Sequence, residues 1–240
     1  MIITAETMHF KTLNEMIRNS RDRDVIIDKC YGQRYIGSGL SGKNITINGT
    51  PGNALGAYLD GATINVNGNA QDAIGDTMNE GEIVVNGSSG DATGYAMRGG
   101  NIFVKQNAGY RAGIHMKSYK DKSPVIVIGG CAGSFLGEYQ AGGKIIVLGI
   151  GNDGAPPVGY FCGTGMHGGK ILLRCDVPPA DLPAQVSVTE AANGALDEFV
   201  PYIDAYCDKF GVNSVDIYDS KFYILEPNTN NPYKRLYTNN

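Results

Sequence analysis

The sequence predicts an all-β fold, a single-stranded right-handed parallel β-helix of about seven coils with short helical caps at both ends. The first observation is a glycine that recurs at steps of 19 residues, at Gly37, Gly56, Gly75, Gly94 and Gly113. The second is a set of apolar columns that keep the same step, such as Ile45, Ile64, Ile83 and Ile102. The third is an Asn-Gly pair after the alternating segments, at 48–49, 67–68 and 86–87, which accepts the positive φ of a sharp corner. A repeat near 20 residues is too short for pairs of helices, so one coil of backbone is the natural unit.

Each repeat is expected to contribute one short strand, and strands that recur in the same direction must pair in parallel. Crossovers between parallel strands are overwhelmingly right-handed, which gives the predicted hand. Ile26 lies 19 residues before Ile45 and extends the ladder towards the N-terminus. An insertion at 117–124 delays the next repeat, and the later strands are expected around 126–128, 145–147 and 171–173. At roughly 4.8 Å per strand the body is about 30 Å long.

We divide the chain into an N-terminal cap at 1–23, the right-handed β-helix at 24–176, and a C-terminal helix and tail at 177–240. An open ladder exposes strand edges and core at its ends, so terminal segments are expected to cover them. Apolar residues follow helical spacing at 10–20 and at 189–210.

In the second helical segment Thr189 is the expected N-cap and Gly211 the expected stop, with a kink at Pro201. Residues 215–225 alternate like a strand, and 226–240 are expected to be irregular.

Composition narrows the class of protein. Charged residues make up 18% of the chain and the net charge is −4, which argues against a nucleic-acid groove. No run of 18 apolar residues and no signal-peptide pattern is present, so a cytoplasmic protein is expected. The five cysteines form no CxxC pair, and they are expected to be reduced, mostly buried thiols rather than disulfides or metal ligands. We therefore expect no metal and no cofactor in this chain.

Two segments, 37–42 and 163–168, match the G-x-G-x-x-G fingerprint of dinucleotide-binding proteins. That fingerprint needs a helix to open at the third glycine, so that its N-terminal N–H groups meet the pyrophosphate. Here a strand is expected after each match, and both sets of glycines belong to the repeat. We interpret them as corner glycines and not as a nucleotide site.

Catalytic groups are sparse. Cys162 is near His167 in sequence, and His115 could lie near them in space, but no acid partner or nucleophile motif accompanies them, so structural histidines are expected. Asp72 and Asp91 are one repeat apart and could form a general-acid pair, although side chains that cap turns are the simpler interpretation. No catalytic residue is assigned.

A polar column of Asp60, Asn79, Arg98 and Lys117 follows the same step as the glycines. It is either a solvated face or a docking surface, while the adjacent methionine column is expected in the core. Insertions in repeat proteins collect on the binding face, which makes 117–124 and 149–168 candidate docking loops. The candidate partner-interface residues are Arg98, Arg111, His115, Lys117 and His167.

The particular strings of the repeat carry a resemblance to a known family. The glycine-rich segments 71–81, 90–100, 109–117, 137–143 and 163–169 resemble the C-terminal β-helix domain of the glutamate synthase large chain in its free-standing form. The resemblance covers roughly 24–176. A scaffold subunit of formylmethanofuran dehydrogenase shares the glycine pattern. Gln140 stands where the family commonly has Met, and Asp76 where Asn is usual.

The resemblance implies a non-catalytic assembly subunit of a glutamate synthase complex. Its expected partners are a synthase subunit that holds FMN and an iron–sulfur centre, and a glutaminase subunit that supplies ammonia. The chain starts Met1-Ile2 and has no cysteine beside them, so it is not expected to be the glutaminase itself. Two alternatives stay open, a scaffold of a formylmethanofuran dehydrogenase-type enzyme and an independent carbohydrate-acting enzyme.

Overall fold

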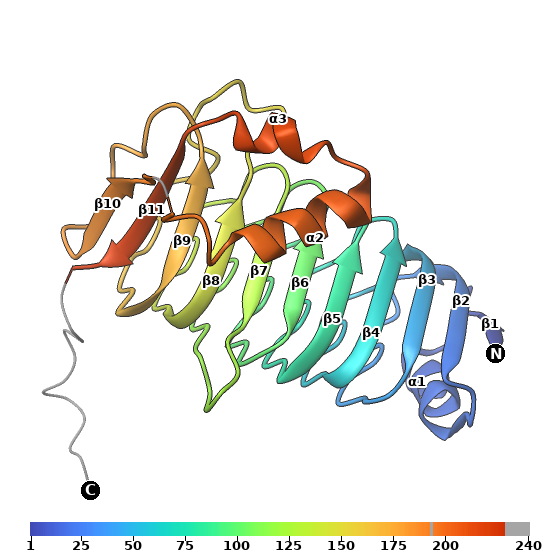
Figure 1. The fold of residues 1–240 in the computed structure, drawn as a ribbon. Coiled ribbons are helices and arrows are strands. Elements are labelled where there is room, and N and C mark those ends of the chain that lie inside the picture. The colour runs from blue at the N-terminus through green and yellow to red at the C-terminus, as the bar shows by residue number, and fades with distance from the viewer. Residues whose placement is uncertain (193, 229–240) are drawn as a thin grey trace, which may run out of the picture.

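The computed structural model describes residues 1–192 and 194–228. Eleven strands form one sheet in the order β1-β2-β3-β4-β5-β6-β7-β8-β9-β11-β10 (Figure 1). The strands are β1 (Ile2–Thr4), β2 (Asp24–Tyr31), β3 (Asn44–Thr50), β4 (Asp60–Asn67), β5 (Glu80–Val85), β6 (Asn101–Val104), β7 (Val125–Ile128), β8 (Ala141–Val147), β9 (Gly168–Arg174), β10 (Val186–Glu190) and β11 (Phe222–Pro227). The helices are α1 (Phe10–Asn19), α2 (Val200–Phe210) and α3 (Ser214–Tyr218).

The fold class predicted from the sequence, a single-stranded right-handed parallel β-helix with helical caps, is wrong. The structure is a single mostly parallel sheet with a few helices, an α/β-type arrangement, in which β11 runs antiparallel to both of its neighbours, β9 and β10. Most repeats contribute one regular strand, and the rest of each repeat is a series of turns. The last described part of the chain adds two strands to the sheet and lays α2 across its face instead of closing the end with a helix (Figure 1). A sequence period gives the step from strand to strand, but it does not decide how many sheets form.

The predicted parallel register is confirmed along most of the ladder. One row of isoleucines occupies paired positions on seven successive strands: Ile45, Ile64, Ile83, Ile102, Ile126, Ile145 and Ile171. All seven are fully buried. The prediction for Ile26 is wrong by one residue, because Val25 pairs with Ile45 and Ile26 turns outward. A slip of one residue moves a side chain to the other face of a strand.

The return segment of each repeat is held by backbone hydrogen bonds to both neighbouring repeats. In the second repeat, Ala54 N–H donates forward to Asp72 O, Gly56 N–H donates back to Ile36 O, and Tyr58 N–H donates forward to Asp76 O, at 2.7–2.9 Å. Left-handed backbone recurs at these positions, two residues before the repeat glycine, at the glycine, and two residues after it. Non-glycine residues there include Ala54, Tyr58, Arg111, His115, Phe135, Tyr139 and Phe161.

Helix α2 covers the outer face of the later strands (Figure 1). Its Phe199 N-cap and its residues Ile203 and Tyr206 are buried against an outward row of apolar side chains: Val84, Phe103, Val127, Ile146 and Leu172. The equivalent residues of the earlier strands are polar, Thr46 and Asn65. Strands β2 to β4 therefore alternate between buried and more exposed residues, whereas all four residues of β7 are buried.

The helix boundaries at the C-terminal side differ from the prediction. Thr189, the expected N-cap, lies in β10, and Pro201 lies in the first turn of α2, where proline is tolerated and causes no kink. Gly211 does end α2, with φ +65°. The expected strand at 215–225 is α3 followed by β11. Of the tail expected to be irregular, 229–240 lies outside the described residues.

The helix expected at 10–20 is present as α1, which buries Leu13 and Ile17 against the inner core near β2. Among the residues that the structure describes, no helix is both long and apolar enough to cross a bilayer.

Candidate functional site

Two stacks of side chains run along the return segments of the last repeats, perpendicular to the strands. In the first, the His115 and Tyr139 rings are stacked with centroids 5.2 Å apart and planes 9° apart. Tyr95 meets His115 edge-on at 6.0 Å. The Tyr139 ring lies directly on Gly165 of the next repeat, where an added Cβ would stand 2.5 Å from a ring carbon.

The second stack is headed by a cation. The Arg111 guanidinium lies 4.9 Å from the centre of the Phe135 ring, and Phe135 stacks on Phe161 at 4.9 Å. Arg111 Nε also donates to Glu138 Oε2 at 2.9 Å. An arginine over an aromatic face is attracted by the ring quadrupole.

The backbone explains both stacks. Successive parallel strands lie about 4.8 Å apart, and aromatic rings stack at centroid distances of about 4.5–7 Å. Left-handed residues at equivalent positions of successive repeats therefore bring their side chains into stacking distance. The two preceding repeats carry Ala73, Thr77, Ala92 and Ala96 at these positions, so the series of stacked left-handed residues begins at Arg111 and His115. We call the set Tyr95, Arg111, His115, Phe135, Tyr139 and Phe161 the stacked-ring surface.

The stacked-ring surface is exposed although it is rich in apolar atoms. Phe161 is 54% exposed, and Tyr95 and Tyr139 are 40% and 37% exposed. The neighbouring Tyr110 and Tyr160 extend it at its border and are 53% and 68% exposed. Clustered exposed aromatics beside an arginine are typical of protein–protein interaction sites.

A second site lies beneath the insertion at 117–124. Tyr119 and Lys122 exchange backbone hydrogen bonds at 3.0 and 3.1 Å, so the insertion forms a tight hairpin with Lys120 in left-handed backbone. The hairpin lines a pocket of about 290 Å³, which we call the hairpin pocket. Its lining residues are Asp60, Asn79, Arg98, Tyr119, Lys120, Asp121 and Lys122.

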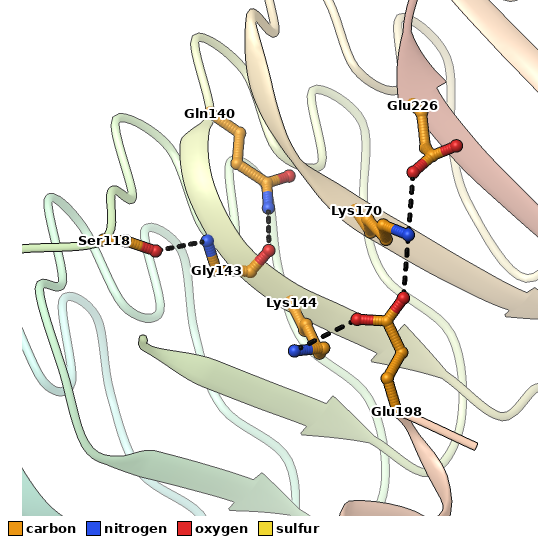
Figure 2. Close-up of polar contacts among 7 residues, drawn as sticks. All are labelled: Ser118, Gln140, Gly143, Lys144, Lys170, Glu198 and Glu226. Carbon is orange, nitrogen blue, oxygen red and sulfur yellow. Dashed lines mark hydrogen bonds and ion pairs between the residues drawn. The ribbon is translucent and has the colours of Figure 1, made fainter. Parts of the chain in front are cut away.

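The hairpin is anchored at both ends. Lys122 Nζ pairs with Glu80 Oε2 at 2.7 Å, and this hydrogen bond raises the pKa of Lys122. At the start of the insertion Ser118 Oγ accepts a hydrogen bond from Gly143 N–H of β8 at 3.1 Å (Figure 2). The insertion is thereby held against strands on both sides.

Gln140 lies beside Gly143 of β8 (Figure 2). It occupies the core column that elsewhere holds leucine or methionine. It is fully buried, and its Nε2 donates to the carbonyls of Gly142 and Gly143 at 3.2 Å each. Its Oε1 has no hydrogen-bond partner within the part of the chain that the structure describes.

A cluster of charges ties the C-terminal segment to the sheet. Glu198, just before α2, pairs with Lys144 of β8 at 3.3 Å and with Lys170 of β9 at 2.7 Å (Figure 2). Lys170 also pairs with Glu226 of β11 at 2.9 Å. Burial raises the pKa of Glu198, but the hydrogen bonds from Lys170 and Lys144 outweigh it, and the net pKa is lowered.

The predicted interface residues fall into two groups. Arg111 and His115 belong to the stacked-ring surface, and Arg98 lines the hairpin pocket. Lys117 is exposed at the start of the insertion and does not line the pocket. His167 is half-buried next to Gly165, with Nδ1 at 3.2 Å from the Gly165 carbonyl oxygen. The two stacks were missed by sequence reasoning, although aromatic residues two positions from successive repeat glycines were a usable signal.

The structure also places the aspartates, the cysteine and the glycine motifs that were considered from the sequence. Asp72 and Asp91 accept hydrogen bonds from the backbone N–H groups of Asp91 and Tyr110, so they cap turns as expected. Cys162 is buried, and burial raises the pKa of its thiol to about 12. Strands β3 and β9 follow the two G-x-G-x-x-G matches, as predicted. Within 1–192 and 194–228, no three His, Cys, Asp or Glu side chains gather closely enough to hold a metal ion.

Known proteins resemble this chain over most of its length. The GXGXG motif family matches residues 3–213. An uncharacterized protein of Methanocaldococcus jannaschii is 43% identical over 251 aligned positions, which cover 99% of this chain and 96% of that protein. A solved structure with a similar fold is a chain of the formyltransferase/hydrolase complex of Methylorubrum extorquens, determined with methylofuran bound to the complex. The TM-score is 0.61 at 18% identity, with 91% of this chain and 88% of that chain covered.

Proposed function

This chain belongs to the GXGXG motif family, and from that premise we propose that it is a non-catalytic assembly subunit of a multi-subunit enzyme. The observation that carries the proposal is the stacked-ring surface. It places exposed aromatic rings and an arginine on the return segments, which backbone hydrogen bonds join to both neighbouring repeats. Interfaces are enriched in these residue types, and a pre-formed surface loses little entropy on binding.

The fold likeness supports membership of a complex, because the similar chain is part of the formyltransferase/hydrolase complex. It favours the scaffold of a formylmethanofuran dehydrogenase-type enzyme as the role to test first. At 18% identity this support concerns the fold alone.

The second candidate is the glutamate synthase complex. It is supported by the glycine-rich strings between 71 and 169 and by the match to the GXGXG motif family. In that complex the partners would be a synthase subunit with FMN and an iron–sulfur centre, and a glutaminase subunit. Ammonia would pass between those two, and this chain would hold them in place.

Affinity purification of the tagged chain from its own cells tests the proposal and separates the candidates. Co-purification of an FMN protein and a glutaminase would favour the glutamate synthase complex, and co-purification of formyl-transferring proteins would favour the other. Recovery of the chain as a monomer that binds neither set of purified partners at about micromolar concentration would contradict the proposal.

A matched pair of variants tests the surface itself. His115→Ala removes a ring from the stacked-ring surface, and we expect it to weaken the complex by at least about tenfold. Tyr58→Ala is the control, because Tyr58 lies at the equivalent left-handed position three repeats earlier (φ +58° against +55°) and is also exposed. Equal effects of the two variants would contradict docking through the stacked-ring surface.

A further inference from the structure

The hairpin pocket contains a cation without a counter-charge. Arg98 is half-buried, and its Nε is enclosed and lacks a hydrogen-bond partner. No ion pair within the described residues involves this guanidinium. A buried guanidinium N–H without an acceptor is costly, about 1–3 kcal/mol or more for a charged group. The arrangement therefore favours an acceptor that enters the pocket from outside.

The imbalance around Lys122, which lines the same pocket, is the reverse. Lys122 is hydrogen-bonded to Glu80, and the charges of Asp60 and Asp121 also act on its ammonium group. Three carboxylates thus act on one ammonium group, and Asp60 and Asp121 have no ion-pair partner of their own among the described residues. This part of the pocket has spare acceptors for a second cation.

The remaining lining residues add further donors. Asn79 carries an amide, and Lys120 lies with its ammonium 5.3 Å from the Tyr119 ring, at the tip of the hairpin. The pocket thus combines an unpaired guanidinium and further donors with carboxylates that lack an ion pair. Its volume of about 290 Å³ is at the low end of ligand sites, so the matching ligand is small.

We propose that the hairpin pocket binds a free α-amino acid, with the carboxylate of the ligand on the Arg98 guanidinium and its ammonium group between Asp60 and Asp121. Arginine recognises carboxylates through paired N–H groups, which suits this end of the ligand. The hairpin, anchored through Lys122 and Ser118, forms the cover of the site. This inference concerns the isolated chain and does not depend on which complex the chain joins.

Titration of the purified full chain tests the proposal. The probes are the twenty common L-amino acids, followed by the deaminated and the decarboxylated counterparts of the tightest one, with binding measured by NMR shifts or calorimetry. We expect saturable binding of at least one amino acid below about 10 mM, and at least about tenfold weaker binding of both counterparts. Absence of saturable binding, or equal binding of the deaminated acid, would overturn the proposal.

Variants assign the two ends of the ligand. Arg98→Met is expected to weaken the amino acid and its deaminated counterpart alike by about tenfold or more. Asp60→Asn is expected to weaken the amino acid and to leave the deaminated counterpart unchanged. Lys117→Ala is the matched control, because Lys117 follows Arg98 in the same column but lies outside the pocket. A loss of amino-acid affinity in Lys117→Ala as large as in Arg98→Met would also overturn the proposal. If Arg98→Met fails to fold, the deaminated and decarboxylated probes still test the proposal on the wild-type chain.

Discussion

Gly56→Ala should destabilise the protein through a clash that can be relieved at a second site. A Cβ added at Gly56 would stand 2.6 Å from Ile83 Cδ1 and at 3.4 Å or more from every other neighbouring atom. The backbone has φ +63°, which costs an alanine about 1–2 kcal/mol, partly offset by the reduced entropy of the unfolded chain. Overpacking adds about 1–3 kcal/mol. We expect a total loss of about 3 kcal/mol in the free energy of unfolding, or roughly 6–12 °C in Tm.

Gly39→Ala separates the two contributions. Gly39 has φ +64°, so the backbone cost is nearly the same, but no atom lies within 4 Å of the added Cβ. We expect this variant to lose only about 1 kcal/mol.

Ile83→Val removes the clashing methyl group, and the next atoms, Ile64 Cδ1 and Ile83 Cγ1, stand at 3.4 and 3.5 Å from the added Cβ, in ordinary contact. The single Ile83→Val change should cost about 0.5–1.5 kcal/mol. In the double variant with Gly56→Ala, we expect a favourable coupling of about 1–2 kcal/mol. Urea and thermal unfolding followed by circular dichroism measure all four chains. If Gly56→Ala is no worse than Gly39→Ala, or if the double variant is simply additive, the steric reasoning fails.

Three further substitutions have measurable outcomes. Gln140→Met removes a buried amide oxygen without a partner and two long hydrogen bonds, and we expect urea unfolding to show a gain of about 1 kcal/mol; a clear loss would mean that the amide is needed by the β8 carbonyls. Tyr206→Phe removes the hydrogen bond from Tyr206 Oη to Lys105 O at 2.8 Å, which ties α2 to the end of β6, and should cost about 1 kcal/mol in the same assay, with no change expected for an exposed control such as Tyr58→Phe. Glu198→Gln should cost less than about 1 kcal/mol at pH 7, because the ion pairs are partly exposed. The folded-state pKa of Glu198 is lowered, so its contribution to the free energy of unfolding is present above the unfolded value of about 4.3 and is lost as pH falls through the folded pKa. The thermal melts of the wild-type and Glu198→Gln chains should therefore converge in acid. A difference in Tm that persists in acid would exclude the ion pairs as its source.

The repeat step and the inward-facing side chains could be predicted from the sequence. A strand has a side-chain period of two, so alternation shows which residues point inward, and parallel strands in register place equivalent residues beside each other. The buried row from Ile45 to Ile171 follows from these rules alone. The turn-capping role of Asp72 and Asp91 follows in the same way, because their spacing places each one beside the backbone of the next repeat.

The candidate sites depended on contacts between distant parts of the chain. Arg98 meets the hairpin around Lys120 and Lys122 only because the insertion folds back over earlier strands, and no local pattern specifies that direction. The aromatic stacks required knowledge that left-handed residues in the return segments point their side chains outward in register.

What the sequence by itself determined about this protein is therefore the 19-residue step, the parallel pairing and the core row, because these depend on nearest-neighbour geometry repeated along the chain. Only the tertiary structure decided that one mixed sheet forms and that α2 lies across its face. That packing joins Tyr206 to Lys105, which are 101 residues apart. The outward row changes from Thr46 and Asn65 to Val84 and Phe103, which indicates that another segment covers the later strands. Only the packed structure identifies that segment as α2, because the hydrophobic effect is non-directional and favours any apolar cover.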